Sequence, residues 1–171
     1  MTVIMKTLGM ILIIVCTTSI GISFARTLSG RVEQLENALG VLSGFESELT
    51  YSLAPLDEIV SRLEQRESMT NAAYLPCCAS LCRSGVPFPA AWKRSIRENH
   101  GLLNSADTAI LTGLSETLGQ CDLNGQLASI AHAKSLLQIQ ADNARDWCAS
   151  NAKLYRTMGL LTGAFLVVIL I

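Results

Sequence analysis

The sequence predicts an all-α protein: a small helical bundle anchored in a membrane by its first and last helices. Apolar residues recur at steps of three and four through most of the chain, which is the spacing of one helix face. The chain shows no convincing period-two runs or hairpin turns, which are the sequence signals of β-strands. Two apolar runs without charge, one near each end of the chain, predict the membrane segments.

The first apolar run lies between Lys6 and Arg26, and its length fits the roughly 17–25 residues of a membrane-spanning helix. A second interpretation is a cleaved secretory signal, because residues 23–25 read SFA, a small-x-small cleavage site. The run exceeds a signal core of roughly 7–15 residues, which favours an uncleaved anchor. We therefore expect a transmembrane helix with a short N-terminal tail over residues 1–25.

The second apolar run follows Arg156 and predicts a C-terminal transmembrane helix over residues 157–171. It is short for a spanning helix, but residues 154–155 can extend it while basic side chains reach the interface. Gly159 and Gly163 form a G-x-x-x-G in this run, a spacing that lets two membrane helices pack closely. Either the first span or another protein is a suitable partner for this packing.

Basic residues flank the middle of the chain at both membrane segments. Arg26 and Arg31 follow the first segment, Lys153 and Arg156 precede the second, and only one lysine and the chain terminus lie outside them. Because basic flanks favour the cytoplasmic side, we expect a cytoplasmic helical bundle over residues 26–156 in a cell-membrane protein.

The first helix of the bundle is expected over residues 26–51, where Leu35 and Leu42 lie on one face. Pro55 stands where a first helical turn tolerates proline, and it opens a second predicted helix over residues 55–68.

A third helix is expected over residues 70–84, disturbed by Pro76. The stretch SGVPFP, residues 84–89, is the clearest loop in the chain. A fourth helix follows over residues 89–101, with Gly101 as a possible C-terminal cap.

A fifth helix is expected over residues 104–119, capped by Asn104 or Ser105. The last helix begins near Asp122 and continues into the C-terminal membrane segment. Its apolar residues at helical spacing are Leu123, Leu127, Ile130 and Leu137.

Composition and motifs argue against nucleic-acid binding and against the common classes of enzyme. Only 16% of the residues are charged, against a usual share of about 25%, and the net charge of −1 gives no reason to expect nucleic-acid binding. The chain lacks a G-x-S-x-G elbow, an H-E-x-x-H motif and a phosphate-binding glycine loop. We therefore predict no catalytic residues and no cofactor, while an enzyme with an unrecognised site remains the least favoured alternative.

The cysteine-rich stretch CCASLC suggests a metal site, because Cys78 and Cys82 lie one helical turn apart. Structural zinc needs four ligands, and the remaining cysteines and histidines are single residues scattered over later helices. Small buried thiols that pack a helix are the favoured interpretation, so no metal is predicted.

Lys93, Arg94 and Arg97 form a small basic face beside Trp92. A solvated helix surface is the favoured interpretation of these four residues. The alternative is a docking patch for an acidic partner or for lipid headgroups.

Two stretches in the middle of the chain, together with its C-terminal run, resemble a known family. The sequence ELTYSLAPLDE, followed far downstream by LSETLGQCDLNGQLASI and LYRTMGLLTGAFLVVIL, is similar to the stage III sporulation protein AB family of endospore-forming bacteria. The matching residues of the first two stretches are Tyr51, Pro55, Leu56, Leu118, Gly119, Asp122 and Gln126. The resemblance covers essentially the whole chain.

The resemblance implies a non-enzymatic component of the complex that connects mother cell and forespore. It also implies a soluble domain similar to the helical domain of the type II secretion F protein. The expected location is the mother-cell membrane around the forespore. The expected partners are other membrane subunits, a cytoplasmic ATPase of the complex and membrane lipid. A membrane-bound sensor or regulator that binds a soluble signalling partner is the alternative function.

For three of the matching residues, physical chemistry suggests structural roles. Gly119 can end one helix in a left-handed conformation, and Asp122 can cap the next helix by accepting backbone N–H bonds near Gly125. Pro55 fixes the entry of the second helix.

Overall fold

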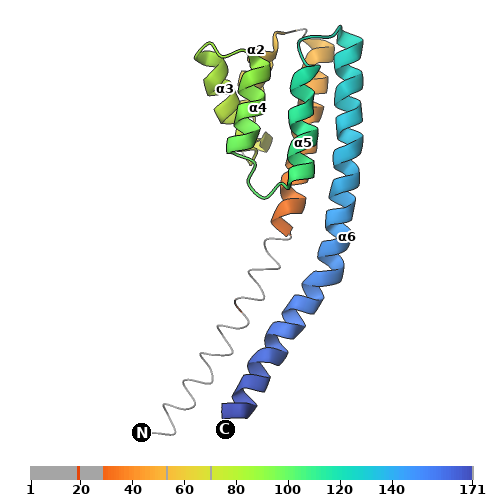
Figure 1. Ribbon diagram of the computed structural model, residues 1–171. Coiled ribbons are helices and arrows are strands. Elements are labelled where there is room, and N and C mark those ends of the chain that lie inside the picture. The colour runs from red at the N-terminus through yellow and green to blue at the C-terminus, as the bar shows by residue number, and fades with distance from the viewer. Residues whose placement is uncertain (1–18, 20–28, 53, 70, 171) are drawn as a thin grey trace. The chain divides into compact units, whose positions relative to one another are not determined.

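The computed structural model describes residues 19, 29–52, 54–69 and 71–170 (Figure 1). All regular structure in these ranges is helical, which confirms the predicted all-α class. The chain divides into two compact units. One unit is Arg31–Asp142, and the other combines Met1–Gly30 with Asn143–Ile171.

The helices follow one another with short connections. Their order is a helix over residues 29–51, α2 (Leu56–Glu64), the 3₁₀ turn η1 (Glu67–Met69), α3 (Tyr74–Arg83), α4 (Phe88–Glu98), α5 (Ser105–Gly113), the 3₁₀ turn η2 (Leu114–Glu116) and α6 (Leu123–Leu170).

Two prolines explain where α2 and α3 begin. Pro55 is the N-cap of α2, with φ −58° and ψ 150°, so it stands just before the first helical turn. Pro76 is the third residue of α3, not a disturbance within a longer helix as predicted. Because a backbone N–H in the first turn has no partner inside the helix, proline costs little there.

The predicted fifth helix is two elements in the structure. Asn104 caps α5 by accepting a hydrogen bond from the Asp107 backbone N–H, and the Asp107 carboxylate accepts one from the Asn104 N–H in return. This capping box satisfies two N–H groups that would otherwise lack partners. After Gly113 the chain tightens into η2 instead of continuing as an α-helix.

The fourth helix ends earlier than predicted, with Asn99 as its C-cap. Gly101 takes the left-handed conformation, with φ +58°, in the turn that follows. It therefore shapes the connection to α5, which begins at Ser105.

Aromatic rings fill the centre of the Arg31–Asp142 unit around Trp92, whose side chain is fully buried. The rings of Phe45 and Tyr74 meet Trp92 edge-on at centroid distances of 5.4 and 5.6 Å, and Phe88 stacks on it at 5.7 Å. The indole N–H donates to the Leu111 carbonyl at 2.8 Å, so its polar group is satisfied. This cluster joins the helix over residues 29–51 to α3, α4 and α5.

A buried ion pair joins elements that are far apart in sequence. Arg31 donates from Nε to Oδ2 of Asp107 at 3.0 Å and from Nη2 to Oδ1 at 3.1 Å. Asp107 is fully buried. The Nη2 of Arg31 also donates to the Gln140 Oε1 at 3.3 Å. One guanidinium therefore connects the helix over residues 29–51 with α5 and α6.

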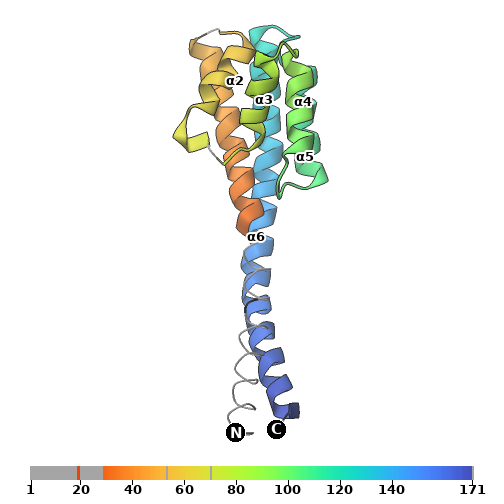
Figure 2. The ribbon, with the colours of Figure 1, turned by 90° about the vertical axis from the view of Figure 1, so that its left-hand side faces the viewer.

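Within the same unit, the helix over residues 29–51 runs beside the first part of α6, as Figures 1 and 2 both show. Lys134 of α6 donates to Oε2 of Glu46 at 2.7 Å across this contact. The buried faces include Leu35 and Leu42 of the first helix and Leu137 of α6. The shared face predicted for Leu35 and Leu42 is confirmed as a buried one.

The second unit includes the later part of α6, which continues as helix to Leu170. None of the helices in the described ranges combines the length and the apolar character that crossing a membrane requires. The predicted anchor over residues 1–25 falls almost wholly outside the described ranges. Gly159 and Gly163 are helical residues of α6, and their packing lies outside what the structure describes.

Replacing Arg31 with methionine is expected to lower the free energy of unfolding by about 3–5 kcal/mol, because the buried Asp107 carboxylate would lose its counter-charge. The measurement is urea unfolding of the full chain in detergent, followed by helical circular dichroism.

Arg97→Ala serves as the charge-matched control, since Arg97 is exposed. It is expected to change the free energy of unfolding by less than about 0.5 kcal/mol. Equal stability of the Arg31→Met and wild-type chains would contradict the role given to the ion pair.

Candidate docking groove

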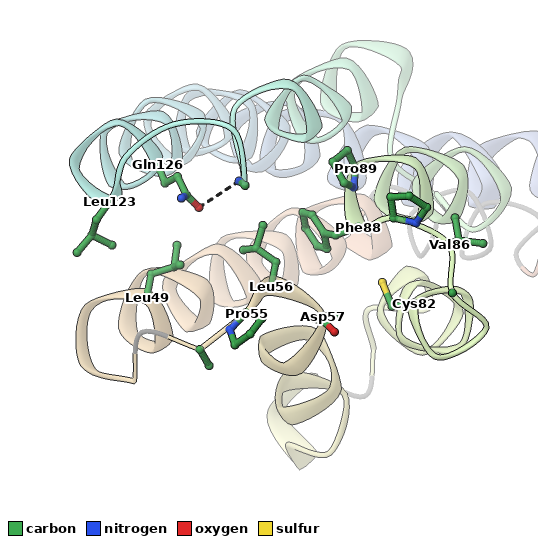
Figure 3. Close-up of a pocket in the computed structure, with 14 residues that line it drawn as sticks. Leu49, Pro55, Leu56, Asp57, Cys82, Val86, Phe88, Pro89, Leu123 and Gln126 are labelled. Atoms are coloured by element: carbon green, nitrogen blue, oxygen red, sulfur yellow. Dashed lines mark hydrogen bonds between the residues drawn. The ribbon is translucent and has the colours of Figure 1, made fainter.

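An open groove of about 660 Å³ lies at one end of the Arg31–Asp142 unit (Figure 3). Its volume is within the range of about 300–1,000 Å³ that is typical of binding clefts. The lining residues, here called the docking groove, are Leu49, Ala54, Pro55, Leu56, Asp57, Cys82, Gly85, Val86, Pro87, Phe88, Pro89, Gly119, Leu123 and Gln126.

Three helices begin at the docking groove. Pro55, Pro87 and Leu123 stand at the starts of α2, α4 and α6. The loop SGVPFP, predicted from its prolines and glycine, supplies the residues from Gly85 to Pro89. In Figure 3, Leu56 lies between Leu49 and Phe88, so apolar side chains from three segments follow one another along the groove.

Gly119 forms the corner that leads from η2 to α6. Its φ of +81° is in the left-handed region, which glycine occupies without steric cost. A Cβ at this position would lie 3.0 Å from the Leu56 Cδ1, so the absence of a side chain also allows close approach to α2. The predicted left-handed conformation is confirmed.

Two polar side chains hold this corner. Gln126 accepts from the Gly119 N–H at 3.2 Å and donates to the Cys121 carbonyl at 2.9 Å. Asp122 accepts from the Gly125 N–H at 3.1 Å, as an N-cap of α6 does. The dashed line in Figure 3 marks the bond from Gly119 to Gln126.

The two sequence stretches that carry the family resemblance meet at the docking groove. Pro55 and Leu56 come from the first stretch, and Gly119 and Gln126 come from the second. The remaining three matching residues lie elsewhere: Leu118 is fully buried beneath the corner, Asp122 caps α6, and Tyr51 is 86% exposed at the end of its helix.

Several groove residues were not found by sequence reasoning. Leu123 was predicted only as the first of an apolar series on the last helix, but its side chain is 37% exposed and lines the groove. The first residue of a helix extends beyond the layer of side chains that the following turns bury, so helical periodicity assigns its face poorly. Asp57 and Cys82 were not predicted to share a site, because their common position depends on the packing of α2 against α3.

The predicted docking patch beside Trp92 needs a correction. Trp92 is fully buried in the aromatic cluster and cannot contribute to a surface. Arg94 and Arg97 are exposed and Lys93 is half-buried, while Arg94 is paired with Glu98 at 2.8 Å one helical turn away. The three cations remain a solvated face of α4, and docking at this face stays an untested prediction.

The cysteines of α3 pack against neighbouring helices. Cys78 is buried and Cys77 and Cys82 are half-buried. Burial raises the pKa of the Cys78 thiol, and burial is also the first cause of the raised pKa of Cys82. Across the described part of the chain, no three His, Cys, Asp or Glu side chains gather as a metal site would require. The raised pKa values favour the neutral thiol form of Cys78 and Cys82.

Comparison with known proteins gives the groove a family context. The family model for Stage III sporulation protein AB matches residues 6–171 of this chain. The chain belongs to the Stage III sporulation protein AB family. The family resemblance seen in the two sequence stretches is thereby confirmed.

Two relatives illustrate the family. The stage III sporulation protein AB of Bacillus subtilis (strain 168) is 27% identical over 172 residues, which covers 97% of this chain and 99% of the relative. A solved structure of a stage III sporulation protein AB aligns with a TM-score of 0.54 at 23% identity, over 70% of this chain and 96% of the solved chain. The second comparison shows that the two chains share a fold.

Replacing Gly119 with alanine is expected to destabilise the chain by about 1–3 kcal/mol, because the new Cβ meets both a left-handed backbone and Leu56. Gly113→Ala is the matched control, since Gly113 has helical φ and ψ and nothing lies within 4 Å of a new Cβ. The control should be neutral or more stable by up to about 1 kcal/mol. Thermal unfolding of both variants provides the measurement, and equal melting temperatures would contradict the strain at Gly119.

Alkylation of the thiols by iodoacetamide at pH 8 should modify the exposed Cys121 first. Because thiolate is the reactive form, the raised pKa of Cys82 lowers its thiolate fraction at this pH and slows its reaction. Cys78 should react only after denaturation. Peptide mass spectrometry of timed samples measures the order, and early modification of Cys78 would be inconsistent with the packing of α3.

Proposed function

We propose that this chain is a non-enzymatic platform of a stage III sporulation complex and that the docking groove receives another subunit. The observation that carries this proposal is the convergence of two family motifs, far apart in sequence, on one open groove of mixed apolar and polar lining. Gly119 and Gln126 maintain the corner, and the corner shapes the groove.

The exposed chemistry of the groove suits a protein partner. Leu123 is an exposed leucine at the groove, and Val86 and Leu56 are half-buried in it. A partner that covers these side chains removes apolar surface from water, which contributes about 25 cal/mol for each Å² buried. Among the described residues that line it, the groove contains no histidine and one carboxylate, Asp57, so its composition favours binding over catalysis.

The proposal includes membrane attachment and an ATPase partner. The two uncharged runs of the sequence, before Arg26 and after Arg156, support attachment to the mother-cell membrane. The likeness to the type II secretion F protein supports an arrangement in which the bundle faces a cytoplasmic ATPase. This part rests on analogy between families and not on the groove.

Replacing Leu123 with glutamine is expected to reduce the number of heat-resistant spores while leaving the protein level unchanged. The change keeps side-chain length and net charge but removes an apolar contact. We expect a loss of about 1–2 kcal/mol in docking, or roughly tenfold in affinity. The measurements are spore counts in the sporulating host, immunoblots of the chain, and co-isolation of the other subunits.

Leu136→Gln is the matched control, because Leu136 is also on α6 and has nearly the same exposed fraction, 36% against 37%. It does not line the docking groove. Normal spore counts and normal co-isolation for both variants would reject the groove as a docking site.

A further inference from the structure

The chain around the docking groove has an unusual distribution of charge. Lysine and arginine are absent from residues 49–61, 84–92 and 113–133, and Arg83, which lies beside the lining residue Cys82, is paired with Glu64 at 2.9 Å. The whole chain is nearly balanced, with 13 basic and 14 acidic residues, so the asymmetry is local. The acidic residues of these stretches are Asp57, Glu58, Glu116 and Asp122.

Part of this negative charge is available to a partner. Arg62 offsets Glu58 through an ion pair at 2.6 Å, and Asp122 is engaged in capping α6. The carboxylates of Asp57 and Glu116 are exposed, and neither makes an ion pair within the described ranges of the chain. Asp57 lies in the groove itself, on the side lined by Cys82 (Figure 3).

The N-termini of the helices at the groove do not make its net charge positive. Each helix N-terminus carries a partial positive charge of roughly half a unit. Asp57 lies in the first turn of α2 and Asp122 at the start of α6. Each carboxylate carries a full negative charge, which outweighs the partial positive charge of its helix N-terminus. At α4, Pro87 and Pro89 have no backbone N–H to offer an anion.

We infer that the docking groove binds an apolar segment of a partner protein that is flanked by lysine or arginine. Exposed Leu123 and half-buried Val86 receive the apolar side chains, and Asp57 attracts the flanking cations. Such charge complementarity raises the association rate and selects among partners. The inference rests on the proposed function, which states only that a subunit docks here, and it adds the chemistry of that subunit.

The basic face of α4 in a second copy of this chain fits the groove poorly. This exposed face carries Arg94 and Arg97, but the neighbouring apolar residues Trp92 and Ile96 are fully buried in the bundle. Among the described residues of α4, that face therefore has exposed cations but no large exposed apolar side chain beside them that could enter the groove. Self-association is one of the outcomes that the experiment separates.

The experiment uses the purified full chain in nanodiscs of zwitterionic phosphatidylcholine. Two fluorescent twelve-residue probes, one of leucine and lysine and the other with glutamate in place of every lysine, are titrated at low and high salt. The lysine probe should bind and the glutamate probe should not, and binding should weaken as salt rises. Fluorescence anisotropy measures both affinities.

Charge variants test whether Asp57 is responsible. Asp57→Lys should weaken binding of the lysine probe by roughly tenfold or more, and Asp57→Asn should weaken it less. Asp146→Lys is the matched control, because Asp146 is an exposed carboxylate of α6 outside the groove and the change in net charge is the same. Leu123→Gln should weaken the same probe, which places it in the groove.

Several results would overturn the inference. Equal binding of both probes, or equal weakening by Asp57→Lys and Asp146→Lys, would remove the charge preference. Light scattering that shows self-association abolished by Asp57→Lys would identify a second copy as the occupant. If probe binding showed no charge preference while Leu123→Gln still lost spores, the docking function would stand and the basic partner would be wrong. A charge-selective groove with normal spore counts for Leu123→Gln would instead reject the docking function.

Discussion

The bundle depends on the bidentate pair between Arg31 and the fully buried Asp107. A buried carboxylate is costly unless a counter-charge and hydrogen bonds satisfy it, and here Arg31 and the Asn104 N–H supply both. Because Asp107 also completes the capping box of α5, one side chain fixes the start of α5 and its distance from the first helix. Gln140 extends the same contact to α6. The positions of three helices thus follow from one carboxylate.

The docking groove is a consequence of this arrangement and of the corner at Gly119. Aligned helices bring the starts of α2, α4 and α6 to one end of the unit, where the connections must turn sharply. Prolines and a left-handed glycine make those turns without regular backbone pairing, so apolar side chains such as Leu123 remain partly uncovered. The groove is therefore formed largely by the connections between helices, whereas the aromatic cluster around Trp92 packs the helices against one another.

Sequence reasoning predicts what local chemistry controls. The helices, the cap by Asn104 and the left-handed Gly119 each depend on residues within a few positions of one another. It fails where the answer depends on distant packing. Trp92 stands beside two cations and was assigned to their face, although the other side of the same helix buries it. The pair of Arg31 with Asp107 joins residues 76 positions apart, and the groove also joins motifs that are far apart in the sequence. The sequence of one helix alone therefore predicts neither the ion pair nor the groove.

The contact between the first helix and α6 sets the order in which the bundle can be completed during synthesis. The partners of the first helix are synthesised much later than the helix itself: Glu46 pairs with Lys134, and Arg31 bonds to Asp107 and Gln140. The first helix can therefore pack against α6 only after the ribosome has passed these positions. Until then the apolar face with Leu35 and Leu42 has no α6 to cover it. Contacts between residues so far apart in sequence slow folding and prolong the exposure of apolar surface to water. The nascent chain is consequently most vulnerable to aggregation and to proteolysis just before its final helix emerges.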